Sequence, residues 1–466
     1  MKKRLSVLLA AALLPAFTAC GGSGLPTAPT LTPTAATAQP TATIAHPAPR
    51  RTPTTEEAPT STSTLAPETP TSGSVETPTI PADEGAVLTD PLAIELQATV
   101  VAGLPATPTP GAEGSDFGGF EGVNVIPLTT RDAPGSLWAA YSYGARRFEP
   151  LEQHFVAVYS HDGADWRELG RVELEDPDYV DRRGVEQVAI EPENAWLQVE
   201  SGVGAHGGCF NLLRFDGQTL HNEVSHCGAA PGSGTVGDLN GDGTLDVLLD
   251  ATDHYVFCYA CNVDYINTEV KRWDGSKMVG VELAPLPATE PDELRRLTDE
   301  AIDLATHDLW KDAQTTVRET LRFNSQDPTY TWDAALINLD ASNRADHIQY
   351  SGFPIVSTIF YGDYPATLDI LRGYNTDEVF NPNSSLFTNT PAEGYIDLLT
   401  QYVTRTTTLQ LEAKPDLAGA YFVRGWSLAL LDPADPNALA DVQRAADLDP
   451  SEGLFAEGLA YLKEQH

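Results

Sequence analysis

A long stretch rich in proline and threonine near the N-terminus keeps that part of the chain out of any packed core. Sixteen of the 35 prolines lie between Pro26 and Pro110, interleaved with Thr, Ala and Ser. Proline fixes φ and lacks a backbone N–H, and so few apolar side chains cannot offset the entropy of ordering. We expect residues 20–113 to be a disordered linker acting as a semi-rigid spacer. Its one more apolar interval, residues 86–101, is expected to dock on the next domain as a strand or short helix.

The extreme N-terminus is typical of an export signal. Residues 1–4 are positively charged, and residues 5–17 form an apolar run too short to span a bilayer. The run Phe17-Thr18-Ala19-Cys20 resembles the lipobox of bacterial lipoproteins. That resemblance implies cleavage of signal peptide 1–19, acylation of Cys20, and a lipid anchor as the only membrane contact, at the periplasmic or cell-surface side. The alternative is a secreted protein with Cys20 as a free thiol.

The charge balance excludes some classes of partner. The chain has 28 basic and 66 acidic side chains, a net charge of −38. Nucleic-acid phosphates need Lys and Arg for neutralisation, so we expect no nucleic-acid partner. Adhesion to anionic lipid is equally disfavoured. Such a charge favours solubility, basic partners or hard cations.

Residues 114–286 have the pattern of antiparallel strands. Short apolar runs end in the Asp-Gly pairs 162–163, 216–217 and 274–275, whose glycines are 54 and 58 residues apart. Asp-Gly between apolar strands strongly indicates a hairpin. The spacing suggests three related units, fewer than an ordinary propeller needs. We therefore predict an antiparallel β-repeat domain that is either a partial propeller or sandwich-like.

One run in this region has the oxygen spacing of a calcium loop. Starting at Asp238, oxygen side chains occupy positions 1, 3, 5 and 9, and Gly243 stands at the turn. Leu249 replaces the glutamate of an EF-hand, and strand-like residues follow. The run resembles the loop of FG-GAP/VCBS (integrin-α-like) repeats. That resemblance implies one structural Ca²⁺ with the ligands Asp238, Asn240, Asp242, Thr244 (backbone carbonyl) and Asp246. The alternative is an acidic turn held by Asx hydrogen bonds without metal.

Four cysteines remain beyond Cys20. Three disulfide pairings are open to them, and in an exported chain we favour Cys209–Cys227 and Cys258–Cys261. Zinc bound by all four and a redox-active Cys-x-x-Cys are the alternatives. His206, His221 and His226 are expected to be surface residues rather than ligands.

Residues 288–466 change to a helical period. Three places combine paired helices with small residues and a closing proline, most clearly the run 420–426 followed by Ala438, Val442 and Pro450. They resemble tetratricopeptide (TPR) repeats, which implies a concave surface for a protein partner. Ala313, Ala366 and Ala438 are 53 and 72 residues apart, so the predicted solenoid is irregular. A generic helical bundle is the alternative.

Together these features predict a multidomain α+β protein. We find no nucleophile elbow, P-loop, zinc-protease helix or nucleotide fingerprint, and we assign no catalytic residue. The expected function is a non-enzymatic, lipid-anchored, extracytoplasmic scaffold that binds a protein through the TPR-like helices. The alternatives are a secreted carbohydrate-active or other hydrolase with an unrecognised active site, and a purely structural envelope protein.

Overall fold

The structure is a computed structural model that describes residues 90–104, 120–131, 137–145, 153–174 and 176–465. All of them belong to one compact unit, Asp83–His466. The predicted signal peptide, Cys20 and most of the predicted linker lie outside the described residues. Within the described part, no helix combines the length and the apolar character that crossing a membrane requires.

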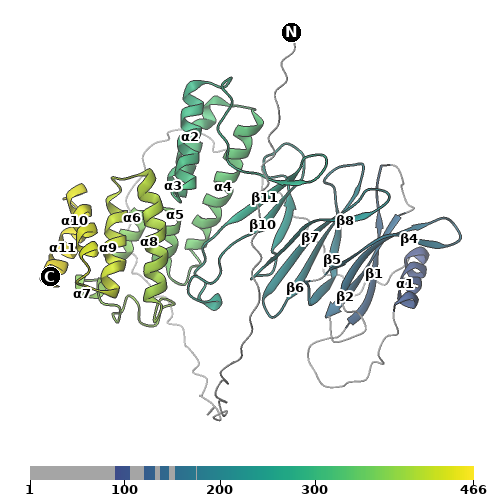
Figure 1. Ribbon diagram of the computed structural model, residues 1–466, viewed down its shortest axis with the longest axis horizontal. Helices are drawn as coiled ribbons and strands as arrows, with labels where there is room; N and C mark the ends of the chain where they lie inside the picture. Colours follow the sequence, from purple (N-terminus) through teal and green to yellow (C-terminus); the bar gives the residue numbers. More distant parts are fainter. Residues whose placement is uncertain (1–89, 105–119, 132–136, 146–152, 175, 466) are drawn as a thin grey trace, which may run out of the picture. The chain divides into compact units, whose positions relative to one another are not determined.

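An eight-stranded and a four-stranded antiparallel sheet form the β-rich half (Figure 1). The large sheet has the order β4-β3-β2-β5-β6-β7-β8, and β1 pairs with β2. The small sheet has the order β12-β11-β10-β9. The bounds are β1 Phe120–Leu128, β2 Leu137–Ala145, β3 His154–His161, β4 Trp166–Leu174, β5 Tyr179–Val188, β6 Ala195–Val203, β7 Gly207–Phe215, β8 Leu220–Gly228, β9 Gly234–Gly237, β10 Asp246–Asp250, β11 Thr268–Trp273 and β12 Met278–Gly280.

The three predicted Asp-Gly hairpins are present. Gly163, Gly217 and Gly275 have φ of 95°, 92° and 95°, a left-handed conformation that glycine adopts without a Cβ penalty. The preceding aspartate in each turn accepts hydrogen bonds from backbone N–H groups two and three residues later. The turns connect β3–β4, β7–β8 and β11–β12.

The units do not form separate blades. Strand β2 pairs with β1, β3 and β5, so the first two hairpins belong to one continuous sheet. The sheet curls into a half-barrel: Gly170 of β4 lies so close to β8 that a Cβ there would be 2.8 Å from the backbone nitrogen of Leu220. Only the third hairpin lies in the small sheet. The β-rich half is therefore a half-barrel with a second sheet packed on it, closer to the sandwich expectation than to a propeller.

The β-rich half has a core on each face of the large sheet. Leu197, Leu213 and Phe215 are among the residues that fill the inside of the half-barrel. On the outer face, Trp196 and Phe210 pack against residues of the small sheet. Alternating residues of β6 and β7 thus face two different cores, as the two-residue strand period requires.

Helix α1 (Pro91–Gly103) covers another part of the outer face. Asp90 caps it by accepting a hydrogen bond from the backbone N–H of Leu92, and Pro91 stands at its first position. Leu96 is buried against β1–β3 side chains such as Trp138. Residues 91–101 of the apolar interval in the predicted linker therefore dock on the β-rich half as a helix, and residues 86–89 lie outside the described residues.

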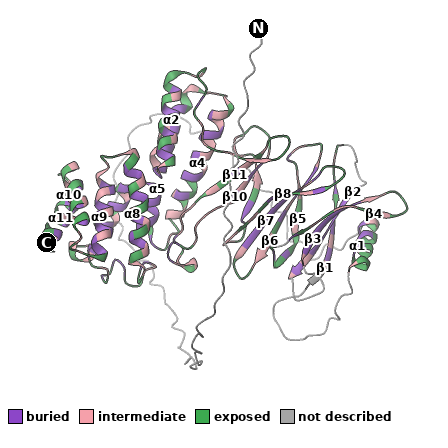
Figure 2. Ribbon diagram, in the orientation of Figure 1, coloured by how far each residue is buried: buried purple, intermediate pink, exposed green. Residues whose placement is uncertain are grey.

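The C-terminal half is helical (Figure 1). Neighbouring helices pack in sequence order, most regularly from α8 to α11. Figure 2 shows buried residues along the faces where helices meet. The bounds are α2 Asp292–Thr306, α3 Trp310–Thr320, α4 Pro328–Ile348, α5 Pro354–Tyr361, α6 Tyr364–Leu371, α7 Thr376–Val379, α8 Ile396–Ala413, α9 Ala418–Leu431, α10 Pro436–Leu448 and α11 Gly453–Gln465, with 3₁₀ turns at Tyr259–Cys261 and Leu321–Phe323.

The connection between strands β10 and β11 of the small sheet packs into the helical core. Residues 251–267, between β10 and β11, are here named the docking segment. Its Val256, Phe257 and Val263 are buried in the same cluster as residues of α2–α11. Its Asn262 accepts a hydrogen bond from the backbone N–H of Gly352, and its Asp253 accepts one from the Tyr402 hydroxyl. The docking segment therefore joins the β-rich half to the helical half by placing its own apolar side chains in the helical core.

Candidate functional site

The predicted calcium loop connects β9 to β10. Gly241 and Gly243 have φ of 76° and 87°, which lets the loop turn tightly. The Asp238 carboxylate accepts hydrogen bonds from the backbone N–H groups of Gly241, Asp242 and Gly243, at 2.8 to 3.1 Å. The Asx hydrogen bonds of the alternative interpretation, an acidic turn, are thus present.

The side chains of the other predicted ligands also form hydrogen bonds within the loop. The Asn240 amide donates to the carboxylate of Asp242 at 3.0 Å, and the second Asp242 oxygen accepts from the backbone N–H of Thr244 at 2.7 Å. Asp246, the first residue of β10, accepts from the backbone N–H of Leu239 at 3.1 Å. Side chains at positions 1, 3, 5 and 9 are therefore all engaged in one loop.

The loop concentrates negative charge around a buried carboxylate. Asp246 is only 1% exposed. Burial raises its pKa to about 6, and the nearby carboxylates of Asp242 and Asp238 add to that rise. The pKa of Asp242 is lowered, chiefly by the hydrogen bond from Asn240, with a smaller effect of Arg272.

The donor set fits a hard cation. Three carboxylates, an amide oxygen and a carbonyl provide only oxygen atoms, the ligands that Ca²⁺ prefers. Within the described ranges, no three His, Cys, Asp or Glu side chains are grouped so that they could hold a metal ion. The carboxylates of Asp238, Asp242 and Asp246 instead accept hydrogen bonds from the loop's own N–H groups.

Both favoured disulfides are present. Cys209–Cys227 joins facing residues of β7 and β8, and Cys258–Cys261 closes a short loop in the docking segment. All four sulfurs are thus used in disulfides, and this arrangement does not support the zinc alternative. The Cys-x-x-Cys pair lies at a 3₁₀ turn rather than at the start of a βαβ helix, so its surroundings are not those of a thioredoxin-like site.

The three histidines singled out in the sequence lie near strand ends. His206 is exposed and its ring is stacked on Tyr259, with centroids 5.0 Å apart. His221 is paired with Asp216 at 3.0 Å. His226 is part-buried and contacts the backbone carbonyl of Asp250 at 2.8 Å.

His254 and His347 form a second histidine group, which was not predicted from the sequence. The ring of His254 lies between the carboxylates of Asp250, at 3.3 Å, and Asp264, at 3.4 Å. His347 of α4 accepts a hydrogen bond from the backbone N–H of Asp264 at 3.3 Å. Burial lowers the pKa of His347. No local spacing could reveal this group, because 83 residues separate Asp264 from His347.

The helical half has a hollow on its surface. A depression of about 340 Å³ runs across α8, α9 and α10. Arg424, one of its lining residues, forms two hydrogen bonds with the Asp441 carboxylate, at 2.7 and 2.8 Å. The hollow is lined by Thr404, Thr408, Arg424, Leu428, Asn437, Ala440 and Asp441.

Comparison with known proteins identifies no family. No family model and no curated protein matches the chain. A solved structure described as "MamA RS-1 ArsTM double mutant" shares 13% identity over 38% of this chain and 85% of that chain, with a TM-score of 0.15. A likeness of that size supports no conclusion about fold or function.

Proposed function

We propose that this protein is a non-enzymatic scaffold that binds a protein partner through its helical half. The observation that supports this most directly is the hollow across α8–α10, in a run of helices that pack in sequence order. Stacked helix pairs commonly present a groove to a peptide or protein. A close helix contact supports the TPR resemblance: a Cβ on Gly425 of α9 would fall 2.8 Å from the Ala438 carbonyl of α10.

A matched pair of substitutions on α9 tests this role. Leu428 lines the hollow, whereas Leu431 is 54% exposed and is not part of its lining. In affinity capture from an envelope extract with the mature chain, we expect Leu428→Glu to lose a partner that wild type and Leu431→Glu both retain. Equal recovery by the two variants would place binding elsewhere and refute the proposed surface.

We further propose that the β9–β10 loop binds one structural Ca²⁺. The oxygen-only donor set of Asp238, Asn240, Asp242, Thr244 and Asp246 supports this assignment. Calorimetric titration should detect the binding of one Ca²⁺ ion, and Ca²⁺ should raise the melting temperature of the protein. Asp242→Ala should lose both effects. Asp274→Ala, which removes an Asx-turn aspartate from another hairpin, is the matched control. No binding at millimolar Ca²⁺ would leave the loop as an acidic turn.

The proposed location is the outer side of a bacterial membrane, reached through acylated Cys20. The lipobox-like run 17–20 supports it. Expression of the full chain in a bacterium should place wild type in the membrane fraction and Cys20→Ser in the soluble extracytoplasmic fraction. Identical fractionation of the two would contradict a lipid anchor.

A further inference from the structure

Hydrogen bonds attach the docking segment to the C-terminal end of α4. The backbone N–H of Asp264 donates to Nε2 of His347 at 3.3 Å. Two residues earlier in the chain, Asn262 donates its side-chain amide to the Tyr350 carbonyl. The Asn262 carbonyl in turn accepts a hydrogen bond from the backbone N–H of Gly352. Among these bonds, the one between Asp264 and His347 has an acceptor that can be protonated.

The Asp264–His347 contact requires a neutral imidazole. Nε2 of His347 accepts the Asp264 N–H, so it carries no hydrogen, and the hydrogen of the ring is on Nδ1. Nδ1 lies 3.8 Å from Oδ2 of the Asp264 carboxylate. An imidazolium would carry a hydrogen on Nε2 as well, and that hydrogen would face the Asp264 N–H. Protonation of His347 therefore removes the acceptor and places two donors against each other.

His254 contacts the other oxygen of the same carboxylate. Its Nδ1 lies 3.4 Å from Oδ1 of Asp264, and its Nε2 lies 3.3 Å from the carboxylate of Asp250 at the end of β10. Both nitrogens of a histidine can donate only when the ring is protonated, so these two contacts fit an imidazolium. One charged and one neutral histidine thus share the carboxylate of Asp264, and the charge on His254 opposes a second one on His347.

Burial favours the neutral form of His347. The side chains of His347 and Asp264 are each only 12% exposed. Burial lowers the pKa of His347, the carboxylate of Asp264 partly offsets this, and the charge on His254 lowers the pKa further. Within the described part of the chain, Asp264 and His254 are the charged groups that act on His347. Arg344 and Asp346, its neighbours on α4, are not among them.

We propose that the Asp264–His347 contact is a pH-sensitive switch: protonation of His347 releases residues 262–264 from the end of α4 and loosens the junction between the two halves. In the open contact, His347 meets water and has the ordinary pKa of about 6.5. Opening therefore takes up a proton. The contact keeps its full strength above pH 6.5 and weakens as the pH falls from there through the lowered pKa, by at most about tenfold per pH unit.

The opening is expected to be local. Val256 and Phe257 of the docking segment are buried in the helical core, and their apolar contacts do not titrate. Amide hydrogen exchange of the mature chain is measured by mass spectrometry at pH 7.5 and pH 5.5 and corrected for the intrinsic exchange rate. We expect peptides containing residues 262–264 to lose protection by at least about threefold at pH 5.5, while peptides from β6 and β7 do not. Equal protection of residues 262–264 at both pH values would overturn the proposal.

Two substitutions separate the switch from a general effect of acid. His347→Gln offers an amide oxygen to the Asp264 N–H and cannot titrate, so protection of residues 262–264 should become the same at both pH values. His221→Gln is the matched control, because His221 is paired with Asp216 on β8, and it should keep the wild-type response. A wild-type response in His347→Gln would refute the role of His347.

His254→Gln provides a second test that leaves His347 in place. Without the positive charge beside Asp264, His347 takes up its proton at a higher pH. The midpoint of the loss of protection, followed from pH 8 to pH 5, should therefore move to higher pH than in wild type. A midpoint that is unchanged or moves to lower pH would contradict the switch.

Discussion

Tyr265 donates its hydroxyl hydrogen to the carboxylate of Asp308, and this bond ties the docking segment to the turn between α2 and α3. The other Asp308 oxygen accepts from the Trp310 indole N–H at 3.0 Å. The guanidinium of Arg344, 3% exposed, lies 4.9 Å from the Tyr265 ring and 4.8 Å from the Trp310 ring. A buried charged pair is thus surrounded by aromatic rings at the point where the two halves meet.

Tyr265→Phe should lower the free energy of unfolding by about 1–3 kcal/mol, because a buried carboxylate oxygen loses its donor. Tyr255→Phe is the matched control, since Tyr255 is 60% exposed, and it should be nearly neutral. Urea denaturation followed by circular dichroism measures both. Equal stability of the two variants would mean that the Tyr265–Asp308 bond adds nothing.

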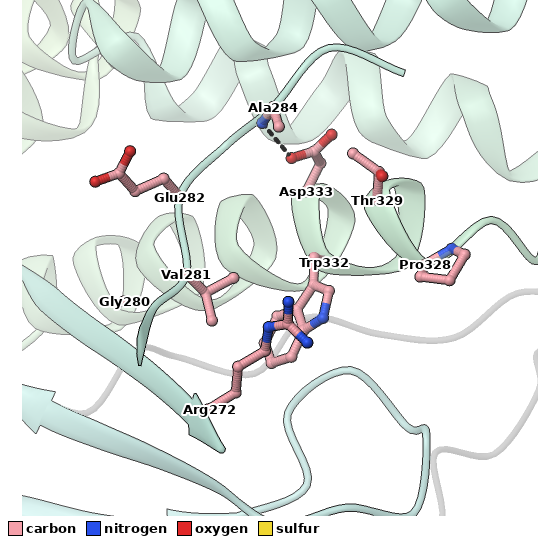
Figure 3. A pocket seen from close by; sticks show the side chains of 9 residues that line it. All are labelled: Arg272, Gly280, Val281, Glu282, Ala284, Pro328, Thr329, Trp332 and Asp333. Atoms are coloured by element: carbon pink, nitrogen blue, oxygen red, sulfur yellow. Dashed lines mark hydrogen bonds between the residues drawn. The ribbon is translucent and has the colours of Figure 1, made fainter. Parts of the chain in front are cut away.

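Asp333→Asn should change how stability depends on pH. Burial raises the pKa of Asp333, which lines the pocket in Figure 3, to about 7 in the folded chain, against 3.8 for an ordinary aspartate carboxyl. The folded state therefore binds more protons between these values, and wild-type stability falls as pH rises from about 4 to about 7. Melting curves should show that the stability of Asp333→Asn increases relative to wild type as the pH rises from 5 to 8. A pH-independent difference would contradict the raised pKa.

Gly425→Ala should destabilise the helical half by about 1–3 kcal/mol. The new methyl would lie 2.8 Å from both the Ala438 carbonyl oxygen and a Val442 methyl. Gly453→Ala places the same methyl in α11 with no atom within 4 Å, and it should be neutral or slightly stabilising. Thermal melts of the two variants distinguish a packing effect from an effect of helix propensity. The higher helix propensity of Ala alone would raise the stability of both variants.

Removal of the Cys209–Cys227 disulfide by a double Ser substitution should cost about 3 kcal/mol, because the bridge closes a loop of 18 residues. The same change at Cys258–Cys261, a separation of 3 residues, should cost about half as much. Guanidinium denaturation under oxidising conditions gives both values. A larger loss at the shorter loop would show that Cys258–Cys261 acts by shaping the docking segment.

Features set by neighbouring residues could be predicted from the sequence. The Asp-Gly turns depend on a glycine at positive φ, and the cysteine pairs lie within one hairpin or one turn. A small residue in a helical run, such as Gly425, likewise indicated a close contact between helices. Features set by distant partners could not be predicted. The merging of the first two hairpins depends on β2, which pairs with β5 only at Gly144 and Ala145.

The same difference between neighbouring and distant partners decides which polar groups could be predicted from the sequence. The loop from Asp238 to Asp246 is visible because its oxygen atoms are spaced within nine residues. Asp333 carries no such signal, because its partner Ala284 is 49 residues away and its free oxygen becomes evident only when burial is known. The His254–Asp264–His347 group likewise depends on how the docking segment meets α4.

The docking segment also constrains the order in which the chain can mature. Its Asp253 contacts Tyr402, 149 residues further along the chain. If the chain is exported from its N-terminus, the β-rich half arrives first with Val256, Phe257 and Val263 facing solvent. Phe257, for example, meets its aromatic neighbours Phe353 and Tyr395 only after those later residues have followed. During that interval the docking segment exposes apolar side chains to chaperones and proteases, and it can pack only when the helical half has been delivered.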